Sequence, residues 1–577
     1  MGEGPATVRG RRSSKTRVRY YAAIGAAVVI GTGIAVGTTV TGASAAPNTV
    51  NAVPVPATSA ASSWYYSPGT ATPIKHLVVL FDENESFDHY FGTYPYAANT
   101  DGSTFHAKAG TPTVNGLYTK ITSSGPTGPL LTDNPNDHYN PERLSHSEAL
   151  TCDQNHGYTP EQEAFNGGKM DMFVQDTQSA STCAAGTDEF FQPGLVLDYF
   201  DGNTVTGLWN YAQNYAMSEN NYDANFGPST PGAVNLISGN DGGGYAVNPT
   251  TGVTEPDPGS VSPLNSSGLG TIYGDLDPAY DDCSDNSHTS TSPVGVLTGQ
   301  NIGNVLNAKN ISWGWFQGGF APTGTNSAGY EVCGTEHENI GGNEVEDYVP
   351  HHDPFQYYKS TANPKHLPPT SEAAIGHTDQ ANHQYDLSDF YETLKDGNMP
   401  SVSFLKAAEY EDAHPGYSDP LDEQTFLVKT INQIEQSKYW ASTAIVITYD
   451  DSDGWYDHQV SPIVNGSDTS ADAAICTPVP VKLGGYSYRC GYGPRLPLVV
   501  ISPYTKANSV SDNLTDQASV TKFIEDNWLG GQRLGSGSFD AISGSLDAPG
   551  GVLDFYTRPQ FRPVILNPTT GEVVNTR

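Results

Sequence analysis

Two apolar runs that each end in acidic residues constrain this chain more than any other feature. The runs are His76–Phe81 and Ala444–Tyr449. The acidic and amide residues that follow them are Asp82, Glu83, Asn84 and Glu85 after the first run, and Asp450 and Asp451 after the second. Short apolar runs of this kind predict strands buried on both faces of a parallel sheet. Because such sheets bind ligands beyond the carboxyl ends of their strands, the runs predict one shared metal site with oxygen ligands.

The remaining patterns predict helices that alternate with strands. Leu427, Ile431 and Ile434 form the apolar stripe of a helix that leads into the second run. Further helices are expected at Val205–Tyr215, Asn301–Lys309 and Ser519–Trp528, and further strands at Ile311–Phe316 and Pro497–Ser502. This alternation predicts an α/β fold, a central mostly parallel sheet with helices on both faces and long loop insertions. Residues 240–300 show little periodicity and predict a surface insertion.

The chain divides into four predicted segments. Residues 1–45 hold a basic stretch, an apolar run and Ala43-Ser44-Ala45, the pattern of a cleaved secretory signal peptide. The apolar run is also near the length that spans a bilayer, so an uncleaved anchor is the alternative. Residues 46–72 read as a flexible linker, 73–530 as one catalytic domain, and 531–577 as an extension packed on it or trailing from it. We therefore expect a secreted, extracellular protein without stable membrane anchoring after cleavage.

Charge and cysteine content narrow the partners and the compartment. The formal net charge is −36, from 27 basic and 63 acidic residues. Such a surface repels nucleic acid and anionic membranes, and an anionic substrate would need compensation by a metal or local cations. The six cysteines fit an oxidising compartment. Although 15 pairings are possible, we expect the sequential one: Cys152–Cys183, Cys283–Cys333 and Cys476–Cys490.

A turn over Asn225–Gly232 offers a candidate nucleophile. Pro231 suits the first turn of a helix, which places Ser229 at or near the N-cap. The free N–H groups and the dipole of a helix N-terminus favour an anion, so the Ser229 hydroxyl could attack phosphorus there. It has no adjacent base in sequence, and a metal would have to lower its pKa. The alternative is an ordinary capping serine.

Loop histidines are the candidate groups for phosphate binding and proton transfer. They are His156, His351, His352 and His414. Imidazolium groups bind phosphate and can protonate a leaving alcohol. A single loop histidine is more often a surface residue, and the acidic turn Asp450–His458 taken alone could be solvated. The segment Gly491–Pro497 reads as a structural loop.

Several of these stretches together resemble the bacterial phosphoesterase family that contains secreted acid phosphatases and phospholipases C. The matching stretches, in order between about Pro73 and Trp528, are Ile74–Leu80 with Glu83–Gly92, Gly227–Ser229, Glu411–Pro415, Thr448–His458, and Gly493–Pro497 through Ser502-Pro503. The resemblance implies an alkaline-phosphatase-like fold with a single metal ion. It also implies that Glu83, Asn84, Asp450, Asp451 and Ser229 are metal ligands and that Ser229 is the nucleophile.

The resemblance assigns phosphate-binding roles to His156 and His414. The third family histidine maps to His351 or His352, with a marginal preference for His352. Three positions depart from the family pattern: Glu85 replaces an arginine, Asp453 a glycine, and Gln517 a histidine. None removes a predicted ligand, but the added charges of Glu85 and Asp453 put the pH optimum and the substrate preference in doubt.

The expected activity is metal-dependent hydrolysis of a small-molecule or phospholipid phosphoester through a phosphoserine. An all-oxygen ligand set favours Ca²⁺, Mg²⁺ or Mn²⁺ over Zn²⁺. Three alternatives remain: a phospholipase C specific for phosphatidylcholine or sphingomyelin, a sulfatase, and an inactive secreted binding protein on the same scaffold. The sulfatase is disfavoured because Ser229–Ala233 lacks the arginine of the sulfatase nucleophile motif. The oligomeric state stays open.

Overall fold

The structure, a computed structural model, describes residues 69–179, 183, 189–467, 472, 476, 479–481, 483, 487–535 and 537–574. The chain divides into two units, residues 1–59 and 60–577. The predicted signal peptide and nearly all of the predicted linker lie outside the described residues.

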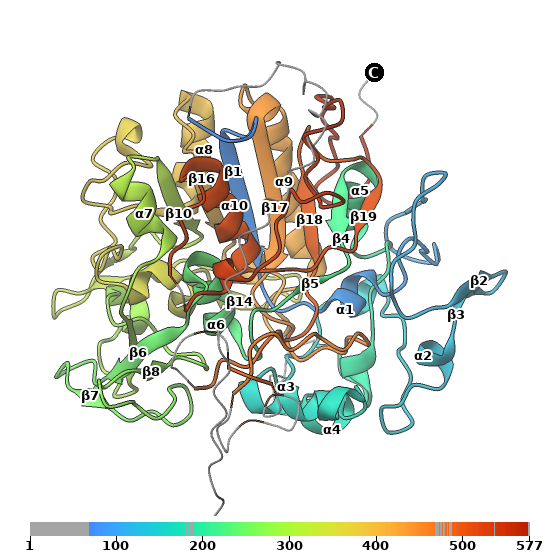
Figure 1. The fold of residues 1–577 in the computed structure, drawn as a ribbon, viewed down its shortest axis with the longest axis horizontal. Helices are drawn as coiled ribbons and strands as arrows, with labels where there is room; N and C mark the ends of the chain where they lie inside the picture. Colours follow the sequence, from blue (N-terminus) through green and yellow to red (C-terminus); the bar gives the residue numbers. More distant parts are fainter. Residues whose placement is uncertain are drawn as a thin grey trace, which may run out of the picture. The chain divides into compact units, whose positions relative to one another are not determined.

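An eight-stranded sheet forms the centre of the second unit (Figure 1). In spatial order its strands are β15 (Gln384–Asp386), β10 (Trp313–Gln317), β16 (Val402–Lys406), β1 (His76–Asp82), β17 (Thr443–Tyr449), β18 (Leu498–Ile501), β4 (Ala216–Ser218) and β19 (Ser509–Ser511). All neighbours pair in parallel except β18, which is antiparallel to both β17 and β4. The predicted mostly parallel α/β sheet is confirmed.

Strand β1 occupies the middle of the sheet because it is apolar on both faces. Val78 and Leu80 belong to the core on one side, and Leu77, Val79 and Phe81 to the core on the other. The helices packed on the first core are α1 (Phe87–Phe91), α5 (Thr206–Asn214), α8 (Leu387–Asp396) and α9 (Pro420–Glu435). Those on the second are α6 (Ser229–Ser238), α7 (Ile302–Ala308) and α10 (Ala518–Trp528), which crosses in front of β1 in Figure 1.

Strand β16 was not predicted, although it lies directly beside β1. Its sequence alternates polar Ser403 and Lys406 with apolar residues, and both polar side chains are fully buried. A polar residue inside a buried strand interrupts the apolar run by which such a strand is recognised. The other predicted strands and helices are present, with ends shifted by one or two residues in most cases.

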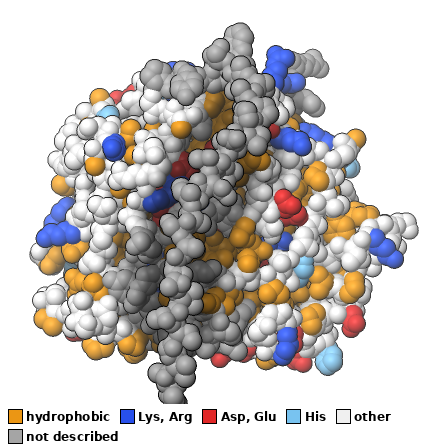
Figure 2. All heavy atoms as spheres, viewed as in Figure 1, with side chains coloured by type: hydrophobic (Ala, Val, Ile, Leu, Met, Phe, Trp, Pro, Cys, Tyr) orange, Lys and Arg blue, Asp and Glu red, His pale blue; other side chains and the backbone are white. Residues whose placement is uncertain are grey.

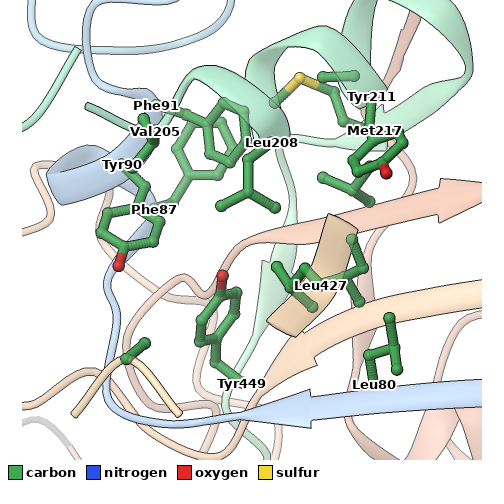
Figure 3. Close-up of a cluster of buried hydrophobic side chains, with 14 of the residues drawn as sticks. Leu80, Phe87, Tyr90, Phe91, Val205, Leu208, Tyr211, Met217, Leu427 and Tyr449 are labelled. Carbon is green, nitrogen blue, oxygen red and sulfur yellow. The ribbon is translucent and has the colours of Figure 1, made fainter. Parts of the chain in front are cut away.

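Helix α1 is held against the sheet by its aromatic residues. Figure 3 shows Phe87, Tyr90 and Phe91 beside residues of α5, α9 and the central strands. The rings of Phe87 and Phe91 stack with their centroids 5.6 Å apart. Burying one such side chain contributes roughly 1.5–3 kcal/mol. Because α1 begins three residues after Asn84, this packing anchors the loop that carries the first two predicted ligands.

The prediction of an irregular surface insertion over residues 240–300 is wrong in part. A four-stranded antiparallel sheet forms there from β6 (Gly242–Val247), β7 (Thr254–Glu255), β8 (Gly270–Thr271) and β9 (Val294–Leu297). Ile272 and Leu297 belong to the same core as α6. A Cβ at Gly244 would lie 2.7 Å from Ile272, so a glycine is needed where the strands approach. Glycine-rich strands hide the alternating pattern from sequence inspection.

The described residues contain further short elements. They are β2 (Lys120–Thr122), β3 (Gly125–Thr127), α2 (Pro129–Thr132), α3 (Tyr158–Phe165), α4 (Phe173–Asp176), β5 (Asn221–Tyr222), β11 (Gly324–Thr325), β12 (Glu331–Val332), β13 (Glu336–Glu338), β14 (Glu344–Glu346) and β20 (Thr515–Asp516). The six cysteines form the predicted sequential disulfides. In the C-terminal segment, Leu546, Val552 and Leu553 join the core of α10.

The face of the molecule shown in Figure 2 carries hydrophobic and charged side chains mixed together. On the face shown in Figure 2, hydrophobic side chains lie in several groups, and Lys and Arg side chains are spread among polar atoms. Within the part of the chain that the structure describes, none of the helices combines the length and the apolar character needed to cross a bilayer.

Candidate active site

The loops that follow β1 and β17 are hydrogen-bonded to each other. The two strands pair in register up to Asp82 and Tyr449, so the residues after them emerge side by side. Asn84 has a left-handed φ of 58°, and its N–H donates to Asp450 Oδ1 at 3.0 Å. The N–H of Glu85 donates to the carbonyl of Asp451 at 3.0 Å. Parallel pairing thus brings together the acids that the sequence places after separate strands.

Helix α6 brings Ser229 to the same edge. Ser229 is the first residue of the helix and Pro228 is the N-cap, so the predicted position is shifted by one residue. A Cβ at Gly232 would lie 2.0 Å from the carbonyl oxygen of Asp450, which shows how closely the first turn of α6 packs against the end of β17. The N–H of Thr230 is not free, because it donates to Asp275 Oδ1 at 2.9 Å.

The five predicted ligands form one buried cluster of oxygen atoms. Ser229 Oγ lies 3.1 Å from Glu83 Oε2, 3.4 Å from Asn84 Oδ1 and 3.2 Å from Asp451 Oδ2. All five side chains, including Asp450, are at most 1% exposed. Burial raises the pKa of Asp451 well above its usual value, and Asp450 raises it further against the opposing effect of His156.

The donor set fits a hard divalent cation. Within the described residues, Asp450 Oδ2 has no hydrogen-bond partner although it is buried. The Asn84 carboxamide lies against both carboxylates, with one terminal atom 3.0 Å from Glu83 Oε2 and 3.2 Å from Asp450 Oδ1. An amide oxygen at this position would share a bound cation with the two carboxylates. Carboxylate, amide and hydroxyl oxygens are the ligands preferred by Ca²⁺, Mg²⁺ and Mn²⁺.

His156 borders the cluster as a charged group. Its Nε2 lies 3.4 Å from Asn84 Nδ2, and its Nδ1 lies 3.1 Å from Asp453 Oδ1. Burial lowers the pKa of His156, but Asp451, Asp453 and Asp153 outweigh it and raise the pKa well above its usual value. Asp453, one of the departures from the family pattern, is thus the partner that orients this imidazolium.

His414 lies opposite His156 as a neutral group. The centroids of the two rings are 5.9 Å apart. Burial lowers the pKa of His414 to about 4. Its Nδ1 lies 2.6 Å from the carbonyl of Pro415, which fixes the proton on Nδ1 and leaves the Nε2 lone pair available. The two histidines therefore differ in protonation at neutral pH.

The structure separates the two candidates for the third histidine. His352 is buried, and its Nδ1 lies 3.3 Å from Glu83 Oε1. The side chain of His351 is 26% exposed, and its Nδ1 lies 3.6 Å from Asp277. Burial lowers the pKa of His352 well below its usual value, whereas Asp277 and Asp275 raise that of His351 to about 9 against the effect of burial. Only His352 contacts a predicted ligand.

Sequence reasoning missed two buried cations. Lys406, at the end of β16, forms an ion pair with Glu83. Arg495 pairs with Asp88 and Asp457, and this network joins the loop after β1 to the loop after β17. Two features of the sequence could have pointed to these cations. One is a lysine at the end of the apolar run Val402–Leu405, and the other is an arginine within Gly491–Pro497, the loop for which a structural role is expected.

The other two departures from the family pattern contact the loops that carry the predicted ligands. Glu85 Oε2 is 3.7 Å from His89 Nε2, beneath the loop. Gln517 bridges backbone groups, since its Nε2 donates to the carbonyl of Asp450 and its Oε1 accepts from Ala224 N–H. Both side chains are buried and structural.

A cavity of about 500 Å³ opens beside the cluster. It is lined by His156 and Pro228, by the aromatic side chains of Tyr158 and Tyr273, and by the carboxylates of Asp153 and Asp275. Among the described residues, its lining contains neither lysine nor arginine. The cavity is large enough for the leaving group of an ester whose phosphorus lies at Ser229.

This chain is similar to several curated phospholipases C, at low sequence identity. The chain is 23% identical over 472 residues to a non-hemolytic phospholipase C of Burkholderia pseudomallei, covering 79% of this chain and 55% of that protein. It is 22% identical to a hemolytic phospholipase C of Pseudomonas aeruginosa, covering 79% and 53%. It is 21% identical to phospholipase C B of Mycobacterium tuberculosis, and the match covers 79% of this chain and 74% of that protein. The chain thus spans about half the length of the first two.

One solved structure and one family model also match this chain. A protein in the alkaline phosphatase superfamily from Vibrio parahaemolyticus matches with a TM-score of 0.24 and 11% identity, covering 57% of this chain and 61% of that chain. A TM-score this low carries no argument. The model of the phosphoesterase family matches residues 74–529, which include every predicted site residue. The chain belongs to the phosphoesterase family.

Proposed function

We propose that this protein is a metal-dependent hydrolase of phosphoric esters that uses Ser229 as its nucleophile. The observation that carries the proposal is the position of Ser229 Oγ, within 3.4 Å of oxygens from Glu83, Asn84 and Asp451 in a fully buried cluster. A hydroxyl surrounded by acceptor oxygens at the start of a helix suits attack on an anionic phosphorus centre. The phospholipase C relatives support a phosphoester substrate.

The residues that would hold the metal are Glu83, Asn84, Ser229, Asp450 and Asp451. When bound, a divalent cation supplies the positive charge that favours the ionised hydroxyl and stabilises charge on the phosphoryl oxygens. One ion of Ca²⁺, Mg²⁺ or Mn²⁺ fits this all-oxygen set. The carboxylates also accept the hydroxyl proton, because two of them lie 3.1 and 3.2 Å from Ser229 Oγ.

The two histidines divide the proton transfers between them. Ser229 Oγ forms a bond to phosphorus while the bond to the leaving oxygen breaks, and the His156 imidazolium donates its Nε2 proton to that oxygen. Neutral His414 then takes a proton from the water that attacks the phosphoserine. The bond between phosphorus and Ser229 Oγ breaks, Ser229 regains its proton from the carboxylate, and phosphate or a phosphomonoester is released. This assignment follows from the opposite pKa shifts of the two groups. His352 orients Glu83 from its far side.

The substrate is proposed as a soluble phosphoester, with a phospholipid as the second candidate. The relatives favour the phospholipid, whereas the strongly acidic composition disfavours docking on anionic bilayers. A choline ester would suit the aromatic and acidic lining of the cavity. The three disulfides are consistent with secretion.

The test is Ser229→Ala, assayed on p-nitrophenyl phosphate and p-nitrophenyl phosphorylcholine with each of the three metals. Loss of a nucleophile is expected to lower kcat by roughly a thousandfold or more. Ser388→Ala is the matched control, because Ser388 lies in the first turn of α8, is exposed and bonds only within its own cap. Retention of more than about a tenth of the activity by Ser229→Ala on both esters would rule out the nucleophile.

A further inference from the structure

The strongest feature that the proposed mechanism leaves unused is a buried ammonium group beneath the metal ligands. Lys406 is fully buried at the end of β16. Strand β16 pairs in parallel with β1 up to Leu80 and Leu405, which directs Lys406 toward the residues after β1. Its Nζ pairs with Glu83 Oε1, while Glu83 Oε2 faces Ser229. The two oxygens of Glu83 thus have different partners, one on each side of the carboxylate.

The surroundings of Lys406 form a group that could hold a cation. Glu83, His352 and Asp412 are buried, and one ligand atom from each lies within 4.8 Å of the others. His352 Nδ1 is 3.3 Å from Glu83 Oε1 and 3.9 Å from Asp412 Oδ2. Within the described residues, Asp412 Oδ2 has no hydrogen-bond partner. Two buried carboxylates this close together favour a positive charge between them, because an unpaired buried charge is costly.

Lys406 supplies this positive charge from within the chain. A lysine is a compact point charge on a flexible stem. Burial lowers the pKa of Lys406, against the raising effect of the nearby carboxylates of Asp450, Asp412, Asp82 and Asp451. The ammonium also lies over the Phe81 ring, with Nζ 5.5 Å from the ring centroid. Both sides of Glu83 are therefore oriented before any metal binds.

We propose that Lys406 is a positioning residue that occupies a second cation position, formed by Glu83, His352 and Asp412, and thereby holds Glu83 toward Ser229. This inference rests on the proposed function of the same site. The proposed role of Lys406 explains how a site with so many buried carboxylates uses one exchangeable ion. The second positive charge is the ammonium group of a residue in β16. Removal of the ammonium should open the position to a second divalent ion.

The experiment counts bound ions on the purified full-length chain with Mn²⁺ alone. Isothermal titration and elemental analysis of the desalted protein should give one ion for the wild type and two for Lys406→Ala, which leaves room for the second. Lys406→Met fills the space without a charge and should bind one ion, with kcat lowered about 10- to 100-fold, the usual effect of losing a partner that orients a ligand. Lys395→Ala, which removes an exposed lysine of α8, is the control.

Each outcome decides between the two proposals. One ion in both the wild type and Lys406→Ala overturns the role of Lys406 and leaves the hydrolase proposal intact. A wild type that binds no divalent ion contradicts the proposed function itself. If Lys406→Ala does not fold, Lys406→Met carries the test: a kcat within threefold of the wild type refutes the inference, and a loss that high Mn²⁺ cannot reverse supports it.

Discussion

Arg495 should be among the most costly residues to replace, because its guanidinium compensates two buried carboxylates. Its Nε lies 3.0 Å from both oxygens of Asp457, and one terminal nitrogen lies 3.2 Å from Asp88. The other terminal nitrogen donates to the carbonyls of Asn115 and Glu219. The guanidinium also lies over the Phe87 ring, 4.3 Å from its centroid. Arg495 is fully buried, and Asp88 and Asp457 are at most 1% exposed.

The substitution Arg495→Met keeps most of the apolar volume and removes the charge and all five hydrogen bonds. Breaking a buried ion pair by removing one partner costs about 3–5 kcal/mol, because the remaining charge stays buried and unpaired. His458 pairs directly with Asp88 at 2.5 Å and interacts with Asp457 as a neighbouring charge, so it compensates Asp88 better than Asp457. We therefore expect a loss of about 3–5 kcal/mol in the free energy of unfolding, measured by urea titration.

A control and a double variant isolate the cause. Lys395 pairs with Glu392 at 2.7 Å and both side chains are exposed, at 70% and 42%, so Lys395→Met should leave the free energy of unfolding almost unchanged. In Arg495→Met/Asp457→Asn the unpaired charge is gone, and part of the lost stability should return. A loss below about 1 kcal/mol for Arg495→Met, or no recovery in the double variant, would refute the reasoning from buried charge.

Three further predictions concern the metal, the helix and pH. Removal of divalent ions with a chelator should abolish activity and lower the thermal midpoint, because the buried carboxylates then repel one another; an unchanged midpoint argues against a bound ion. Gly232→Ala should lower activity strongly, since the new Cβ meets the Asp450 carbonyl at 2.0 Å and must move Ser229; wild-type kcat would contradict that packing. Asp281, 2.7 Å from His366 Nε2, raises the pKa of His366 against the effect of burial. The pair therefore stabilises the fold fully below the unfolded pKa of about 6.5 and loses its effect as pH rises through the folded pKa. The stability difference between wild type and His366→Gln should shrink as pH rises above the unfolded pKa of about 6.5, and a constant difference would disprove the assignment.

Much of the candidate site was predictable because strand ends and ligands are adjacent in sequence. The apolar runs locate the acids at the strand ends, because a charge is costly inside a buried strand. The resemblance to the phosphoesterase family then distinguished Glu83 and Asn84 from Asp82, which is the last residue of β1. The first turn of α6 is equally local, because Pro231 favours the first turn of a helix, and the helix begins at Ser229.

Strand order and side-chain direction were not predictable in the same way. Nothing local to Val402–Lys406 indicates that it pairs with β1 rather than with an edge strand, and the buried Lys406 obscures its apolar pattern. His351 and His352 are neighbours in sequence, yet one contacts Asp277 and the other Glu83, because successive residues of a tight turn point in different directions.

The sequence by itself determined an α/β domain with a cluster of oxygen ligands at one edge of its sheet, since apolar runs and the acids that end them are local features. Only the tertiary structure decided which cations compensate those acids. The cations are Lys406, Arg495 and His156. Each of them pairs with a carboxylate more than a hundred residues away in the sequence, so the pairing depends on how the whole core is packed. The physical reason is that burial makes each carboxylate depend on a specific positive partner, and packing alone selects that partner.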